Sequence, residues 1–170
     1  MRISIADRNS DLEALTATFS DNLTASYISH SELQGRRAIR PDQWTGDIKT
    51  VLRGEIAERL GEPMDGFPSA EFWQGVIEAR DDGDIVAIAF VTLSRKANVP
   101  FGVIEDIVVN AKLRGHGRGE AMMEWMFDTF RRAGVNRVFL ESGITNEKAH
   151  HLFEHLGFKT VSIVMMRDEP

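Results

Sequence analysis

The spacing of apolar residues in the first part of the chain predicts a strand, a helix and then mostly loop. Ile3 and Ile5 alternate with polar neighbours, which is the period of a half-buried strand. The sequence "SDLE" at residues 10–13 has the spacing of a capping box and predicts that a helix begins there. Between residues 29 and 70 the pattern predicts one amphipathic helix, "DIKTVLRGEIAERLG" at 47–61, and loop elsewhere.

Beyond residue 72 the pattern changes to strands that alternate with helices. An Asp-Gly turn in "DDGD", residues 81–84, separates two apolar runs and predicts a β-hairpin. The further elements expected are a strand at 101–110, a helix at about 117–133, a strand at 135–142, a helix at 145–157 and a last strand at 158–167. This order predicts an α/β (α+β) fold, in which a mixed sheet carries helices on its faces.

Composition narrows the classes of protein to consider. A chain of 170 residues with 42% hydrophobic content can bury one sizeable core, so a single domain over residues 1–170 is expected. The formal net charge of −6 argues against nucleic acid as a partner. The absence of cysteine excludes disulfides, thiolate metal sites and cysteine nucleophiles. The sequence has no signal-peptide pattern and no run of about 18 apolar residues, which predicts a cytoplasmic protein without membrane contact.

A glycine-rich segment, "LRGHGRGEAMMEW" at Leu113–Trp125, lies between a predicted strand and a predicted helix. Glycine permits positive φ and close approach of a ligand to the main chain, and a helix N-terminus attracts negative charge. Positive side chains surround the same turn in an otherwise acidic chain: Lys112, Arg114, His116 and Arg118. The segment therefore predicts an anion-binding loop, and a flexible linker is the alternative.

The spacing of the glycines excludes two familiar phosphate-binding motifs. Gly119 is followed by Glu120 rather than by the Lys and Ser/Thr of a Walker A loop. The dinucleotide fingerprint fails too, because neither Gly115 nor Gly117 begins a complete Gly-x-Gly-x-x-Gly pattern. What remains is Arg-x-x-Gly-x-Gly, from Arg114 to Gly119.

On this motif the chain resembles the GNAT superfamily of acetyl-CoA-dependent N-acetyltransferases. The resemblance continues through "RVFLESGITNEKAHHLFEHLGF" and covers nearly all of residues 72–164. It implies a single GNAT-like domain with a mixed, mostly antiparallel central sheet and helices on both faces. It also implies that residues 101–158 form the acetyl-CoA-binding core and that acetyl-CoA is the cosubstrate.

Residues that would contact coenzyme A are carried over from the resemblance. Backbone amides at Ile107, Val108 and Val109 would hold the acetyl carbonyl and the pantetheine arm, as an oxyanion-type donor does. The loop would wrap the pyrophosphate with Arg114, Gly115, His116, Gly117, Arg118 and Gly119. Asn146 matches a family asparagine that contacts coenzyme A. Phe153 stands where many members have a tyrosine that protonates the departing thiolate, so water, Ser142 or another group would supply that proton, or the thiolate would leave unassisted.

Two adjacent carboxylates on the strand before the loop are the candidates for acid–base chemistry. An amine must be neutral to attack a thioester, whereas alkyl amines are protonated near pH 7, so some group must take the proton. Strand alternation puts Glu105 and Asp106 on opposite faces of an apolar strand. Glu105 is the first choice as the base or as the ligand that orients the amine, and Asp106 is the second. The structural alternative is that one carboxylate pairs with an arginine while the other reaches water at a bulge.

The acceptor is less well defined than the donor. "VIEDIVVNAKLRGHGRG" is similar to the branch that acetylates aminosugar phosphates, and residues 29–70 are expected to shape the acceptor site. Arg36, Arg37 and Arg40 would bind an anionic group there, or they form a solvated turn. The expected function is transfer of an acetyl group to a primary amine of a small molecule. Transfer to a protein or peptide amine and a non-catalytic coenzyme A-binding module are the alternatives.

Two further expectations concern metals and assembly. His151 and His155 have a spacing that can bind zinc, but no third ligand is evident, so they are interpreted as surface residues and no metal is expected. The resemblance makes a homodimer plausible, whereas the residue pattern carries no information on oligomeric state.

Overall fold

The computed structural model describes residues 1–169, which divide into two compact units. We call residues 1–23 and 49–141 the sheet unit, and residues 24–48 together with 142–169 the small unit. Within the described residues, no helix is long and apolar enough to cross a membrane.

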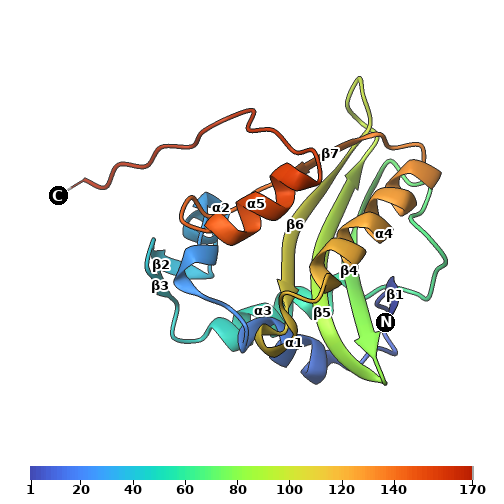
Figure 1. The fold of residues 1–170 in the computed structure, drawn as a ribbon, viewed down its shortest axis with the longest axis horizontal. Helices are drawn as coiled ribbons and strands as arrows, with labels where there is room; N and C mark the ends of the chain where they lie inside the picture. The colour runs from blue at the N-terminus through green and yellow to red at the C-terminus, as the bar shows by residue number, and fades with distance from the viewer. Residues whose placement is uncertain (170) are drawn as a thin grey trace. The chain divides into compact units, whose positions relative to one another are not determined.

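The sheet unit contains the central sheet, in which the described residues supply five strands in the order β1-β4-β5-β6-β7 (Figure 1). The strands are β1 (Arg2–Ile5), β4 (Phe72–Asp81), β5 (Asp84–Ser94), β6 (Phe101–Val109) and β7 (Arg137–Leu140). Neighbouring strands pair antiparallel except β6 and β7, which run parallel. The mixed, mostly antiparallel sheet expected from the sequence is therefore confirmed.

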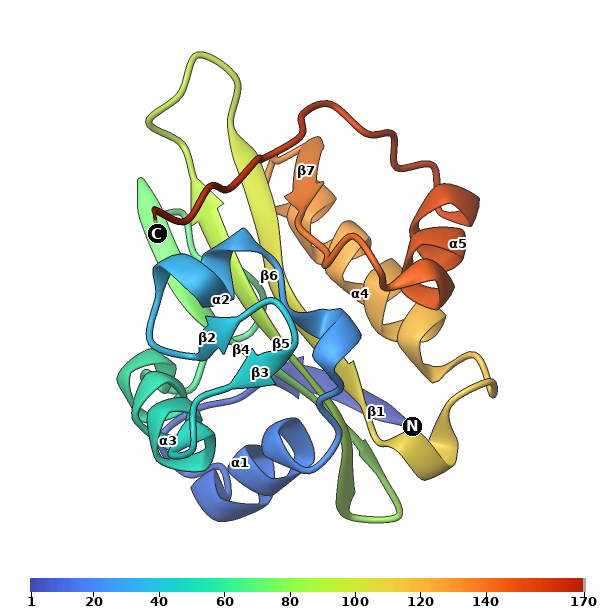
Figure 2. The ribbon, with the colours of Figure 1, turned by 90° about the vertical axis from the view of Figure 1, so that its left-hand side faces the viewer.

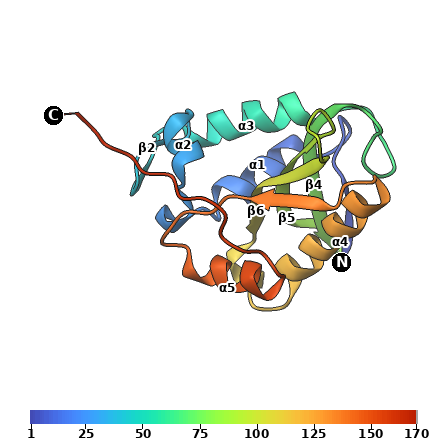
Figure 3. The same ribbon diagram turned by 90° about the horizontal axis from the view of Figure 1, so that it is seen from above.

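Helices cover both faces of this sheet, as predicted. The helical segments are α1 (Leu12–Ser20), α3 (Ile48–Arg59), the short 3₁₀ segment η2 (Ala111–Leu113) and α4 (Arg118–Arg132). Figure 3 shows α1 and α3 along one face of the strands and α4 along the other. The two faces are therefore both buried, which agrees with the continuous apolar run of β5.

Side chains from both layers meet the sheet in a dry core. On one side, the rings of Phe19 on α1 and Phe90 on β5 meet edge to face at a centroid distance of 5.2 Å. On the other side, α4 buries Met122, Met123, Met126 and Phe130 completely. The methionine and aromatic residues of α4 therefore belong to the core, as their helical spacing predicts.

The β4–β5 hairpin closes with the turn that its Asp-Gly signal predicts. Asp82 has φ 50° and Gly83 has φ 95°, so both central residues are in the left-handed region of a type I′ turn. One predicted detail of the sheet unit differs. The N-cap of α1 is Asp11, which accepts from the Ala14 N–H at 3.0 Å, whereas Ser10 accepts from the Asp7 N–H. The capping box predicted at Ser10 is wrong because its hydroxyl closes the preceding turn.

The small unit holds more regular structure than the sequence pattern indicated. Its elements are η1 (Ala25–Tyr27), α2 (His30–Gln34), β2 (Ala38–Arg40), β3 (Gln43–Trp44) and α5 (Glu147–His155). The prediction of loop before residue 47 is therefore wrong. The missed signal is Ser29 with Glu32, which form the capping box of α2, with the Ser29 N–H donating to Glu32 at 2.7 Å.

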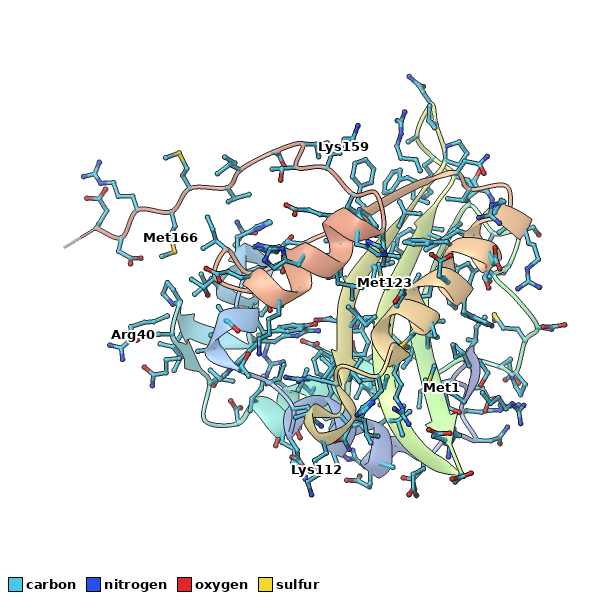
Figure 4. All side chains as sticks on the ribbon, viewed as in Figure 1. Met1, Arg40, Lys112, Met123, Lys159 and Met166 are labelled. Carbon is cyan, nitrogen blue, oxygen red and sulfur yellow. The ribbon has the colours of Figure 1, made fainter. Side chains whose placement is uncertain are left out.

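The last strand predicted from the sequence is also absent from the described residues. Beyond α5, Gly157 has φ 89° and the Phe158 N–H donates to the Phe153 carbonyl at 3.0 Å, which ends the helix as expected. Residues 158–169 then form no strand, and the side chains of Val161, Ile163 and Met165 are 77%, 75% and 90% exposed. Figure 4 labels Met166 on this segment, which we call the C-terminal segment. A segment with apolar alternation forms a strand only where a neighbouring strand supplies backbone hydrogen bonds.

Candidate functional site

The glycine-rich loop joins β6 to α4 and adopts the backbone that its glycines permit. The Asn110 side chain accepts from the Lys112 N–H at 3.1 Å and opens η2, on which Figure 4 labels Lys112. Gly115 has φ 80° and Gly117 has φ 72°, both in the left-handed region where a side chain is strained. A Cβ atom built at either glycine would meet no described atom within 4 Å. The main chain of the loop is therefore open to a ligand.

The loop leads into α4 through a glycine at the N-cap position. The N-cap residue is Gly117, which has no side chain to cap the helix. The first intrahelical bond runs from the Ala121 N–H to the Gly117 carbonyl at 2.9 Å. Because the N–H groups before that bond have no intrahelical acceptor and add to the helix dipole, this end of α4 suits an anion.

The two arginines of the loop anchor it to the rest of the sheet unit. Arg114 donates to the Val109 carbonyl at 3.0 Å and to the Asn22 carbonyl at 2.7 Å. The Asn22 side chain in turn accepts from the Ala111 N–H at 2.7 Å. The turn that follows α1 therefore fixes η2 and the start of the loop. Asn22 carries no motif, so the sequence pattern did not mark it.

Arg118, the first residue of α4, contacts the end of β4 instead. It donates to Asp81 at 2.7 Å, and the N-terminal amine lies 3.6 Å from the same carboxylate. The hydrogen bond from Arg118 is the largest influence on the Asp81 carboxyl and holds its pKa below its usual value. Burial opposes this lowering of the pKa, and the N-terminal amine adds to it. His116, between the two arginines, is exposed. The predicted positive turn thus carries two arginines with structural partners.

Glu105 lies at a β-bulge of β6. Phe90 of β5 pairs with Asp106 and Val91 pairs with Ile104, so Glu105 is the extra residue on the bulged strand. A bulge changes the direction of the side chain it carries. Asp106 is 3% exposed, whereas Glu105 is half-buried, so the two carboxylates lie on faces of different exposure, as strand alternation predicts.

Both oxygens of Glu105 accept hydrogen bonds from residues distant in sequence. Thr92 on β5 donates its hydroxyl to Oε1, and Arg59 at the end of α3 donates to Oε2 at 3.2 Å. The Arg59 guanidinium carbon also lies 4.6 Å from the centroid of the Phe90 ring. One part of the structural alternative stated for this strand is observed, because Glu105 pairs with an arginine. The other part is not observed, because Asp106 is buried and does not reach water at the bulge.

The edge of β6 beyond the carboxylates has no strand alongside it among residues 1–169. β7 pairs with β6 only from Phe101 to Ile104, as Figure 2 allows the reader to follow. The stretch of β6 at 107–109 pairs with β5 on its other side. This is the stretch in which Ile107, Val108 and Val109 were predicted to bind the cosubstrate.

The remaining predicted residues lie in the small unit. Asn146 is the N-cap residue of α5, and its carbonyl accepts from Ala149 and His150, each at 3.0 Å. Phe153 is buried on the same helix, with its ring centroid 6.1 Å from that of Phe158. Ser142 is half-buried, ahead of α5.

The three arginines near the start of the chain differ in their surroundings. Arg37 forms an ion pair with the buried Glu32 at 3.4 Å. Arg40 donates to Gln43 across the β2–β3 pair at 2.6 Å, and Arg36 is exposed. Arg37 therefore has a structural partner, whereas Arg36 and Arg40 are exposed. The solvated-turn alternative thus describes Arg36 and Arg40 but not Arg37.

His151 and His155 are both exposed on α5. Among residues 1–169, no cluster of three His, Asp or Glu side chains has the arrangement of a metal site.

Residues 38–158 match the acetyltransferase (GNAT) family, and the chain belongs to this family. Its fold is accordingly that of a GNAT domain.

Individual relatives are similar at low identity. Mycothiol acetyltransferase of Beutenbergia cavernae is 34% identical over 83 residues, which cover 49% of this chain and 28% of that protein. Glucosamine 6-phosphate N-acetyltransferase of Arabidopsis thaliana is 30% identical over 95 residues, which cover 54% of this chain and 62% of that protein. The matches thus span less than two thirds of either relative. A structure of the BH1408 protein from Bacillus halodurans superimposes with a TM-score of 0.73 at 16% identity, covering 99% of this chain and 100% of that one.

Proposed function

We propose that this protein transfers an acetyl group from acetyl-CoA to the primary amine of a small molecule. The observation that carries the proposal is the junction of β6 with α4, where Glu105 precedes a loop with two positive-φ glycines and a helix whose N-cap residue is Gly117. The family uses acetyl-CoA, and the open main chain at Gly115 and Gly117 suits its pyrophosphate. Anion binding and acid–base chemistry on one continuous segment favour catalysis over simple binding.

In the proposed reaction the amine nitrogen attacks the thioester carbonyl directly. The new C–N bond forms, the C–S bond breaks, and the thiolate of coenzyme A leaves with the bonding electron pair. The proton of the amine passes to a carboxylate, with Glu105 as first choice and Asp106 as second. Backbone N–H groups at 107–109 stabilise the negative charge that develops on the carbonyl oxygen. Since Phe153 has no proton to donate, water, Ser142 or another group protonates the thiolate, or the thiolate leaves unassisted.

The acceptor class is the finer part of the proposal. The relative from Arabidopsis thaliana is named for an aminosugar phosphate, and the segment resembling that branch includes both carboxylates. We therefore rank aminosugars and their phosphates first, ahead of other small amines and of protein or peptide amines. Residues 29–70 are the part of the chain expected to shape this specificity for the acceptor. A cytoplasmic location of the protein remains a separate prediction.

The test is release of coenzyme A thiol from acetyl-CoA across a panel of amines. The panel holds aminosugars, aminosugar phosphates, polyamines, amino acids and short peptides, with Glu105→Gln assayed beside the wild type. Turnover with one amine class, reduced about 100-fold or more in the variant, supports the proposal, since general acid–base groups contribute about 10²–10⁴-fold. Acetyl-CoA binding without turnover on any amine would instead support a non-catalytic coenzyme A-binding module.

A homodimer is the remaining part of the proposal. The exposed apolar side chains of the C-terminal segment support it, because burying them against another molecule is favourable. Light scattering after gel filtration should give twice the mass of the 19.1 kDa chain, and Ile163→Asp should lower it toward the single-chain value. A wild-type chain that elutes as a monomer at all concentrations contradicts this part alone.

A further inference from the structure

Glu105 is held by two side chains that come from different layers of the sheet unit. Thr92 approaches along the neighbouring strand and donates to one carboxylate oxygen, whereas Arg59 approaches from α3 and donates to the other. A carboxylate has about four lone-pair sites, so two donors still leave acceptor capacity for a substrate N–H. The two contacts therefore fix the direction of the carboxylate without filling it.

Arg59 is itself restrained on several sides. Its second terminal nitrogen donates to the Glu55 carbonyl one turn earlier in α3 at 3.2 Å. Its guanidinium faces the Phe90 ring at 4.6 Å, and the side chain is only 15% exposed. A planar, partly buried guanidinium with these neighbours loses little further freedom when it holds a carboxylate.

The β-bulge explains why such restraint is needed. Glu105 has no partner residue across the β5–β6 ladder, since Ile104 and Asp106 pair with consecutive residues of β5. A side chain at a bulge is aimed by local distortion rather than by regular pleating. Without its two donors, the Glu105 side chain has several staggered rotamers available on a half-exposed surface.

We propose that Arg59 and Thr92 are positioning residues that hold the Glu105 carboxylate in the orientation that receives the acceptor amine. This inference rests on the proposed function, because it assigns Glu105 a contact with the amine. It adds two residues from outside the β6–α4 segment to the site. Neither donates to the substrate, and both act through Glu105.

The kinetic test uses paired substitutions at each position. Arg59→Gln and Thr92→Val should each lower kcat/KM for the amine by about 10- to 100-fold, as misplacement of a catalytic group does. Thr92→Ser keeps the hydroxyl and should restore activity to near the wild-type value. The affinity for acetyl-CoA, measured by calorimetry, should stay unchanged in all of them, because neither residue lies in the glycine loop.

Arg53→Gln is the matched control. Arg53 lies on the same helix and pairs with Glu13 at 2.6 Å, but both side chains of that pair are exposed. Removing it deletes an arginine–glutamate pair from α3 without touching Glu105, so amine kinetics should not change. Equal losses in Arg53→Gln and Arg59→Gln, or the same activity in Thr92→Val and Thr92→Ser, would overturn the proposal.

A measurement independent of turnover separates this proposal from the proposed function. With ¹³C-labelled glutamate, the Glu105 side-chain carboxyl resonance, assigned from Glu105→Gln, should move in Arg59→Gln and Thr92→Val and stay in Arg53→Gln. If no amine is acetylated but the resonance behaves in this way, the positioning contacts stand and the assigned chemistry fails. An unmoved resonance in both variants would refute the positioning role itself.

Discussion

The N-terminal end of α4 offers a direct test of the loop, because the same helix carries a matched control at its other end. Gly117 precedes α4 with φ 72°, and Gly134 follows it with φ 74°. A Cβ atom at either position would meet no described atom within 4 Å. Alanine therefore introduces the same backbone strain at both sites and no steric clash with the described chain.

The expected cost in folding free energy is the same for Gly117→Ala and Gly134→Ala. Placing a non-glycine residue in the left-handed region costs about 1–2 kcal/mol. For a chain of this length, about 1 kcal/mol lowers the melting temperature by about 2–4 °C, so each variant should melt about 2–8 °C below the wild type. Thermal unfolding followed by circular dichroism measures this shift.

Acetyl-CoA affinity should distinguish the two variants. If the loop N–H groups hold the pyrophosphate, a methyl group at Gly117 stands where the ligand approaches and weakens a hydrogen bond to a charged group. Such a bond contributes about 1.5–3 kcal/mol, so Kd should rise about 10-fold or more in Gly117→Ala. Gly134→Ala should bind as the wild type does in the same calorimetric titration. Equal affinity in both variants would refute the assignment of the loop as the anion site.

Two further predictions concern packing and pH. Gly102→Ala should destabilise the fold by about 1–3 kcal/mol, because its Cβ would clash with the buried Phe130 ring. Gly54→Ala, on the exposed side of α3, should stabilise the fold by about 0.5–1 kcal/mol. Chemical denaturation of both variants checks this, and destabilisation of the same size at both positions contradicts it. The pKa of Asp81 is lowered by the hydrogen bond from Arg118, so this carboxylate stabilises the fold above its ordinary pKa and loses that contribution as pH falls below about 4. Thermal melts between pH 7 and pH 3 should therefore be less pH-dependent in Asp81→Asn, and an unchanged slope would argue against the bond.

Local signals predicted the sheet unit well because they act over a few residues. The Asp-Gly pair sets the β4–β5 turn through its own backbone preference, and Gly117 sets the entry to α4 in the same way. The same locality explains the errors. Ser29 and Ser10 both begin a capping-box pattern, but only Ser29 caps a helix, since the Ser10 hydroxyl is used by Asp7.

The C-terminal segment shows the limit of periodicity. Its apolar residues alternate as a strand requires, yet within the described chain it forms no strand. Alternation describes which side chains share a face, whereas a strand also needs a neighbour to accept and donate backbone hydrogen bonds. Only the tertiary structure decides whether that neighbour is present.

The sequence by itself determined the backbone of the glycine loop and the opposite faces of Glu105 and Asp106, because glycine spacing and strand alternation are properties of contiguous residues. The tertiary structure decided what surrounds Glu105. Arg59 lies 46 residues before it and Thr92 lies 13 residues before it, and neither stands in a recognisable motif. They meet because α3 packs on the sheet while β5 pairs with β6, and such contacts depend on the packing of whole elements rather than on any local pattern.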